Sequence, residues 1–189
     1  AVAVVKAGVF TIIKGTFYLF GLDNLSVSGA NEYLLPVAAI TIILASLIAM
    51  QQDNLKARLA YSTVSQLSYV VLGALLANVF GIIAAAMHLV MHAFAKITLF
   101  FCAGAIYVAT KKKYISQLNG IGKQMPITMT AFFIGALSVT GLPPTGGFIS
   151  KWMMLMGAVD AKLTLIMVVY LVSSFLNALN AICLDNCVT

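Results

Sequence analysis

Two histidines and one lysine follow one another at intervals of four residues, His88, His92 and Lys96, inside a long apolar run. Four residues are close to one helical turn, so the three side chains lie along one stripe of a helix, about 6 Å apart along its axis. Burial disfavours the charged forms of lysine and histidine, which brings both within reach of proton exchange near physiological pH. The stripe therefore predicts a relay that passes protons through intervening water.

Two other interpretations of this stripe are open. The histidines are core residues bonded to backbone partners, and Lys96 reaches outward to water; the position of Lys96 near the middle of its span disfavours the second half of this reading. A metal site at His88 and His92 is disfavoured because no carboxylate accompanies them on that span.

Another lysine, Lys151, follows a run of residues that break helices. Prolines remove backbone donors, and glycines loosen a helix further. Unwound backbone at membrane depth is tolerated where it is buried in protein or lines a cavity, and broken helices mark ion sites in transporters. The pattern predicts an ion site at Lys151, with an interfacial anchor formed by Lys151 and Trp152 as the alternative. The break itself is carried by Pro143, Pro144, Gly146 and Gly147.

A further basic residue and one polar span complete the set of candidates. Lys6 lies deep in the membrane if its span begins upstream, and it reaches the interface if Ala1 is the true start. Ser62, Gln66 and Tyr69 share one face of an unusually polar span. They either line a water pathway or bond neighbouring helices together, and both readings are open.

The elements that position these residues are apolar helices. Of the 189 residues 62% are hydrophobic and 8% are charged, whereas soluble domains carry roughly 25% charged residues. A membrane span needs about 20 apolar residues. We therefore expect an all-α polytopic membrane protein with about six transmembrane helices in a single domain, residues 1–189. The expected spans are 1–20, 33–50, 59–76, 81–108, 126–159, which is broken at 141–147, and 163–184.

The basic residues indicate an orientation. Loops 51–58 and 111–123 hold Lys56, Arg58, three consecutive lysines from Lys111 and Lys123, whereas the other loops hold mostly acidic residues. The positive-inside rule predicts that these two loops are cytoplasmic, in what we expect to be a bacterial inner membrane. The same distribution argues against nucleic-acid binding, despite a net charge of +6.

The sequence also bears on cofactors and on whether the chain is part of a longer protein. It contains no nucleotide, flavin or haem motif, and Cys183 and Cys187 are more simply explained as small buried residues than as a weak metal site. We expect no cofactor and no metal. The chain begins without methionine inside an apolar run, which favours a fragment of a longer protein.

Three ordered motifs resemble the antiporter-like subunits shared by respiratory complex I, membrane-bound hydrogenases and Mrp-type cation/proton antiporters. They are Asp-Asn-Leu-Lys-Ala-Arg-Leu-Ala-Tyr-Ser-Thr-Val-Ser-Gln-Leu-Ser-Tyr over 53–69, His-Leu-Val-Met-His-Ala-Phe-Ala-Lys from His88, and Gly-Leu-Pro-Pro-Thr-Gly-Gly-Phe-Ile-Ser-Lys over 141–151. The residues of these motifs resemble those of an Mrp-type subunit slightly more than those of a complex I subunit.

The resemblance implies an architecture and roles. Such subunits have two inverted five-helix repeats, and this chain looks like the second one, 33–184, preceded by the end of another helix, 1–20. Lys6 would then link two half-channels, His88, His92 and Lys96 would form the central relay, and Lys151 would exchange protons at its end. The first repeat has no counterpart in this chain, so a complete pathway is not implied.

The sequence thus predicts translocation of protons, or of a monovalent cation such as Na⁺ against protons, in a multisubunit antiporter or a complex I-like NADH:quinone oxidoreductase. Its expected partners are the lipid bilayer and other membrane subunits. A structural subunit of a redox complex that transports nothing is the alternative, and such a scaffold tolerates loss of its buried charges.

Overall fold

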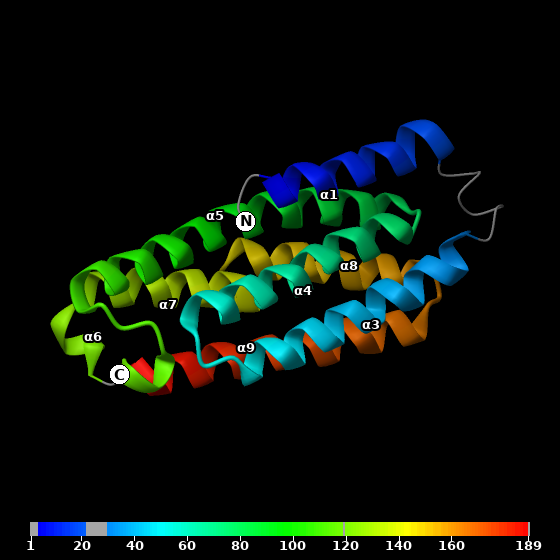
Figure 1. Ribbon diagram of the computed structural model, residues 1–189. Helices are drawn as coiled ribbons and strands as arrows, with labels where there is room; N and C mark the ends of the chain where they lie inside the picture. Colours follow the sequence, from blue (N-terminus) through cyan, green and yellow to red (C-terminus); the bar gives the residue numbers. More distant parts are fainter. Residues whose placement is uncertain (1–3, 22–29, 119, 189) are drawn as a thin grey trace.

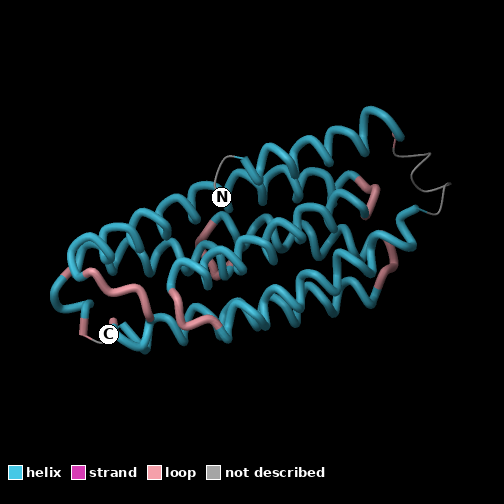
Figure 2. The backbone as a smooth tube through the Cα atoms, viewed as in Figure 1, coloured by secondary structure: helices cyan, strands magenta, loops and turns pink. Residues whose placement is uncertain are grey.

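In the computed structural model, residues 4–21, 30–118 and 120–188 are described, and they form an elongated bundle of helices (Figures 1 and 2). Within these ranges the only strand-like pairing is an isolated antiparallel bridge between Asn54 and Tyr114. The elements are α1 Val4–Gly15, the π-helical turn η1 Thr16–Phe20, α3 Ala30–Gln51, α4 Leu55–Leu75, α5 Val79–Thr110, the 3-10 turn η2 Ile115–Gln117, α6 Ile121–Gln124, α7 Pro126–Thr140, α8 Gly146–Asp160 and α9 Thr164–Val188.

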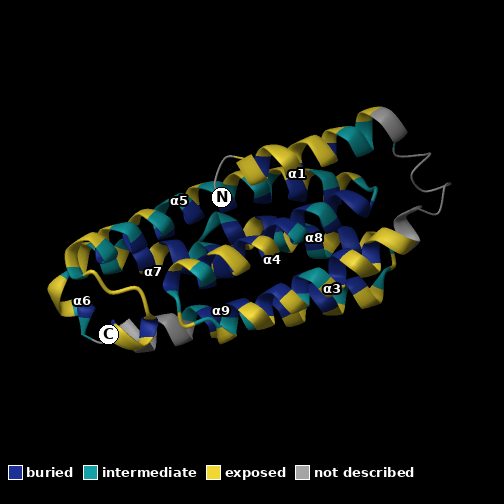
Figure 3. Ribbon diagram, in the orientation of Figure 1, coloured by how far each residue is buried: buried dark blue, intermediate teal, exposed yellow. Residues whose placement is uncertain are grey.

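The protein is a polytopic all-α membrane protein. Within the described residues, three segments are long and apolar enough to cross a membrane, namely 33–51, 79–110 and 164–181. Exposed residues lie along the outer faces of the helices (Figure 3). They include large apolar residues such as Phe101, Ile127 and Leu165. In a lipid bilayer such a surface needs no polar cover.

Helix α5 packs against α4, α7 and α8, while α3 packs against α4 and α9. Two apolar clusters stabilise the bundle, one around Leu99 and Phe132 and the other around Leu72 and Met154. The helix α1 lies along the outer edge (Figure 1) and packs on α4 through a third cluster.

The predicted break between 141 and 147 is confirmed. Helix α7 ends at Gly141, which adopts a left-handed conformation with φ of +82° and donates its N–H to the carbonyl of Leu137 at 3.0 Å. A cis peptide bond joins Pro143 and Pro144, and α8 starts at Gly146. Each half-helix has 15 residues, about 22 Å, so neither spans the hydrocarbon layer alone.

The expected span 33–50 starts too late. Helix α3 begins at Ala30, so Pro36, which would lie in the first turn of a helix that starts at residue 33, lies inside the helix. The residues before Tyr33 are polar and were therefore left out of the apolar span. A helix satisfies its own backbone groups, however, and it continues beyond the apolar segment.

The segments 51–58 and 111–123 meet at one end of the bundle, and the second of them includes the start of α6. The turns after α4 and α8 lie at the opposite end (Figure 1). This arrangement follows from the alternating directions of the helices. It gathers the basic loop residues at a single end.

Candidate functional site

The predicted stripe of His88, His92 and Lys96 is fully buried along the inner face of α5. Apolar residues of α5 occupy its other faces, so the helix can contact lipid on one side and the rest of the protein on the other. Lys96 is only 1% exposed, which places a titratable amine in the interior of the bundle.

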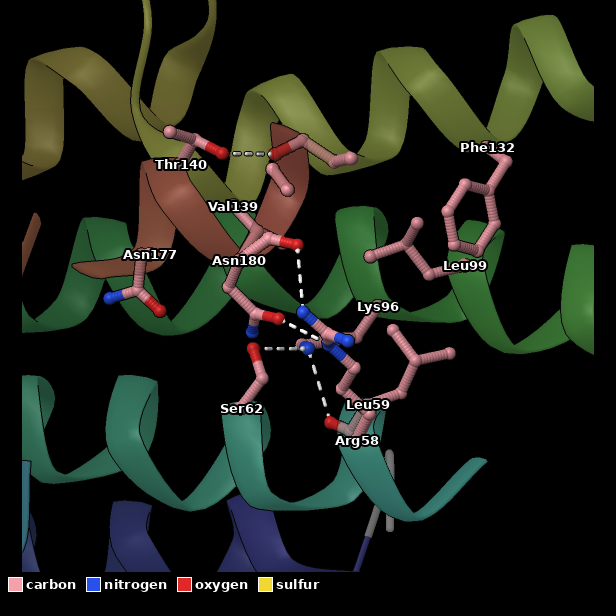
Figure 4. Close-up of a pocket in the computed structure, with 12 residues that line it drawn as sticks. Arg58, Leu59, Ser62, Lys96, Leu99, Phe132, Val139, Thr140, Asn177 and Asn180 are labelled. Carbon is pink, nitrogen blue, oxygen red and sulfur yellow. Dashed lines mark hydrogen bonds between the residues drawn. The ribbon is translucent and has the colours of Figure 1, made fainter. Parts of the chain in front are cut away.

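The ammonium of Lys96 is held by α4. Its Nζ donates to the hydroxyl of Ser62 at 2.9 Å and to the carbonyl of Leu59 at 3.2 Å (Figure 4). Both acceptors are neutral. Beside it lies a cavity of about 30 Å³ whose polar lining includes Thr140 and Asn177. A polar cavity of this size accommodates at least one water molecule.

His88 is bonded at both ring nitrogens. Its Nδ1 lies 2.8 Å from the hydroxyl of Ser150 on α8, and its Nε2 lies 3.0 Å from Oε1 of Gln66 on α4. The ring is therefore fixed between two helices. Since Ser150 precedes Lys151, the bond also connects the α5 stripe to the broken helix.

His92 and Lys6 differ from the other basic residues of the site. Neither ring nitrogen of His92, nor the Nζ of Lys6, has a hydrogen-bond partner among the described residues, although these atoms are buried. The rings of His88 and His92 are stacked, with centroids 6.1 Å apart. Lys6 is 8% exposed on α1. Buried polar atoms of this kind are normally bonded to ordered water.

Lys151 is turned inward across the break. Its Nζ donates to the carbonyls of Val139 at 3.0 Å and Thr140 at 2.9 Å, at the C-terminal end of α7. A helix C-terminus carries partial negative charge, so it stabilises an ammonium group. The same Nζ lies 5.3 Å from the centre of the Tyr69 ring.

A cavity of about 250 Å³ opens beside this lysine. Its wall includes Thr140 and Ser174 as well as Trp152, which is 54% exposed on the outer surface. The predicted alternative, an interfacial pair of Lys151 and Trp152, does not describe this geometry, because the amine of Lys151 is bonded to backbone carbonyls of α7 whereas Trp152 is exposed.

The polar face of α4 runs parallel to the basic residues. Ser62 bonds to Lys96, Gln66 bonds to His88, and Tyr69 faces Lys151. Each residue predicted to line a pathway therefore contacts a different member of the basic set. Of the break residues, Pro143 and Pro144 lie between α7 and α8, whereas Gly146 and Gly147 are the first two residues of α8, which carries Lys151.

Sequence reasoning missed one buried cation. Arg58 was expected in the basic loop 51–58, but α4 begins at Leu55, so Arg58 is in its first turn and is 4% exposed. Its guanidinium donates to the side-chain oxygen and the carbonyl of Asn180 on α9 (Figure 4). Asparagines at 177 and 180, three apart in an apolar run, were the available signal.

Replacing Asn180 by alanine is expected to lower the stability of the protein by about 2 kcal/mol, because it removes the side-chain acceptor of the buried guanidinium and leaves only the backbone carbonyl of residue 180. Asn177→Ala is the matched control, since Asn177 is equally buried but donates only to Ser173 of its own helix. The thermal unfolding midpoint of the purified protein in lipid nanodiscs measures both variants. Equal midpoints for the two would contradict the role of Asn180.

The thiols of Cys183 and Cys187 lie outside the side chains that the structure describes. Among the described residues, no group of three or more histidine, cysteine, aspartate or glutamate side chains is arranged to hold a metal ion.

Comparison with known proteins identifies the family to which the chain belongs. The family model described as "NADH:quinone oxidoreductase/Mrp antiporter, TM" matches residues 1–177. The chain belongs to this family. Among curated members, NADH-quinone oxidoreductase subunit N of Desulforudis audaxviator is 43% identical over 142 residues, and subunit M of Rickettsia prowazekii is 33% identical over 158 residues.

Two solved structures contain chains with the same fold. A chain of the Mrp complex from Dietzia sp. matches with a TM-score of 0.88 and 30% identity over 94% of this chain, and a chain of an archaeal membrane-bound sulfane sulfur reductase matches with 0.87 and 26% identity over 95%. The sequence match to subunit N spans 75% of this chain and 28% of that relative. The match to subunit M spans 82% of this chain and 32% of that relative. The chain therefore spans about a third of the length of these relatives, and both the complex I and the Mrp branch occur among them.

Proposed function

We propose that this chain translocates protons, or a monovalent cation in exchange for protons, through a relay of Lys6, His88, His92, Lys96 and Lys151. The family membership supports this proposal, since the relatives are named as subunits of NADH-quinone oxidoreductases and of an Mrp complex. The relay passes from α1, through the stripe on α5, to the broken helix.

The observation that carries the proposal is the environment of Lys96. Its amine is enclosed in the bundle and bonded to two neutral acceptors, a hydroxyl and a carbonyl. Burying a charge in a membrane interior costs about 2.5–3.5 kcal/mol even on lenient scales, so it is kept where it has a function. With no carboxylate to fix its charge among its bonded partners, Lys96 can be either charged or neutral, as a relay requires.

Water completes the relay in this proposal. His88 contacts protein groups at both nitrogens, whereas His92 and Lys6 have no protein partner in the described part of the chain. Water molecules bonded to these atoms would join neighbouring relay members. Ser62, Gln66 and Tyr69 then line the pathway, each beside one basic residue.

The proposal extends to the assembly in which the chain works. In this proposal residues 33–184 are a five-helix repeat within a single transmembrane domain, and 1–20 correspond to the end of a helix that precedes the repeat. Other membrane subunits and the bilayer are its partners, and H⁺, with Na⁺ in an antiporter, is its substrate. The loops 51–58 and 111–123 face the cytoplasm of a bacterial cell, in accordance with the positive-inside rule.

In vesicles that contain the whole complex, Lys151→Met is expected to lower proton translocation about tenfold, equivalent to roughly 1.4 kcal/mol. Without its amine, the broken helix no longer offers a group that binds and releases a proton. The loss is moderate because the adjacent cavity opens outward and admits water. Quenching of a pH-sensitive dye after energisation measures the translocation rate.

Lys162→Met is the matched control, because Lys162 is exposed in the turn after α8 and is outside the relay. Lys151→Arg retains the charge and the bonds to the carbonyls but does not release a proton, so it should be impaired as well. Unchanged translocation in Lys151→Met, with normal complex assembly, would overturn the relay and favour a scaffold that transports nothing.

A further inference from the structure

A second cluster of basic residues lies at the end of the bundle next to α6, outside the relay. Helix α5 ends at Thr110 and is capped by Lys111, whose left-handed φ of 59° turns the chain back towards α4. There the N–H of Leu55 donates to the carbonyl of Lys113 at 3.2 Å, and the N–H of Ile115 donates to the carbonyl of Asp53 at 2.8 Å. Backbone bonds thus hold two distant segments of the sequence side by side.

The lysines of both segments converge on one aromatic ring. The ammonium groups of Lys56, Lys111 and Lys113 lie 4.9, 5.8 and 5.4 Å from the centre of the Tyr107 ring. Each contact has the geometry of a cation–π interaction. Three like charges around one ring repel one another, so a bound anion would stabilise the arrangement.

No nearby carboxylate takes this role among the acidic side chains that the structure describes, those of Asp53 and Asp160. Asp53 uses both of its carboxylate oxygens on Ser116, at 3.1 and 2.9 Å. Asp160 lies at the opposite end of the bundle, where it accepts a hydrogen bond from Asn78. The positive charge of the cluster is therefore available to a ligand.

A cavity of about 380 Å³ lies beside the ring. Four polar side chains line it: Asn54, Lys56, Lys112 and Lys113. The rest of its wall is formed by Leu55, Ala103 and Tyr107. Ala103 lies seven residues before the end of α5, roughly 10 Å along the helix axis. Leu55 and Ala103 are buried, so the cavity extends from the charged end of the bundle to apolar side chains between α4 and α5.

We propose that this cavity binds the phosphate head group of an anionic phospholipid. The charge complements a phosphate, and basic pockets between transmembrane helices on the cytoplasmic side are a common form of lipid recognition. A free phosphate ion would use the lysines alone. A phospholipid also uses the apolar part of the wall, because its glycerol and first acyl carbons would lie against Leu55, Ala103 and the ring of Tyr107.

The test uses the full-length protein in its complex, reconstituted into phosphatidylcholine nanodiscs with increasing amounts of a photoactivatable phosphatidylglycerol. Mass spectrometry quantifies labelling of peptides from the cavity wall. Lys113→Gln is expected to weaken the apparent affinity about fivefold, and Lys56→Gln combined with Lys113→Gln about 30-fold. Lys123→Gln is the matched control, since Lys123 is an exposed lysine at the same end that does not line the cavity.

The outcomes separate the possible occupants. Labelling that falls in the cavity variants, is unchanged in Lys123→Gln and resists competition by millimolar inorganic phosphate supports the lipid site. Equal labelling of all variants would overturn it. Displacement of the lipid by inorganic phosphate would assign the cavity to a free anion, and crosslinks to a neighbouring subunit in place of lipid would assign it to a protein contact; either result overturns the proposal.

Discussion

Replacement of Lys96 by methionine is expected to reduce proton translocation about a hundredfold while the complex still assembles. Methionine fills a similar volume with an apolar chain, and the hydroxyl of Ser62 and the carbonyl of Leu59 lose a donor rather than gain a charge. A proton that crosses this part of the bundle would then travel on water in a cavity of only about 30 Å³, without an amine to carry it. The rate in vesicles, divided by the amount of assembled complex, measures the effect.

Two further variants make this prediction specific. Lys14→Met removes a lysine from α1 whose side chain is exposed, and it should leave translocation unchanged. Lys96→Arg keeps a positive charge that does not deprotonate, and it should be as inactive as Lys96→Met. Translocation by Lys96→Arg at the wild-type rate would show that charge alone, without proton exchange, is sufficient, which contradicts a relay through Lys96.

The second large effect is expected at the broken helix. A Cβ atom on Gly147 would lie 1.9 Å from the backbone oxygen of Ser138, far inside the contact distance. Because the opposing atom belongs to the backbone of α7, the two half-helices would have to separate. Gly147→Ala should therefore destabilise the protein by about 3 kcal/mol or more and reduce the yield of folded protein. Thermal unfolding in nanodiscs measures the change.

Gly104→Ala provides the control for this substitution. Gly104 also lies in a helix, but a Cβ there would have no neighbour within 4 Å, so alanine should be neutral or stabilising by up to about 1 kcal/mol. If both variants unfolded at the wild-type temperature, close packing of the half-helices at Gly147 would not be required, and the geometry of the break would have to be reconsidered.

Features written in local patterns were predictable from the sequence. The four-residue spacing from His88 to Lys96 is sufficient to put the three side chains on one face of a helix, whatever the helix packs against. The break was predictable for a similar reason, since two prolines and their flanking glycines limit helix formation by themselves. The apolar outer surface follows from composition alone.

Features that depend on packing between helices were not predictable. Arg58 was read as a loop residue because its neighbours are charged, and only the approach of Asn180, 122 residues later, makes its burial possible. Periodicity also does not reveal that Gln66 bonds to His88, or that Lys151 reaches back to α7. Such contacts depend on how far each helix is shifted along its neighbour, which no single helix determines.

The bonds of Lys151 have a consequence for the way in which a proton would leave it. A charged lysine has three N–H bonds, and two of them point to the carbonyls of Val139 and Thr140. A neutral amine retains two. The side chain can therefore give up its third hydrogen and keep both attachments to the end of α7. Proton exchange at this position requires no swing of the side chain and no opening of the bundle.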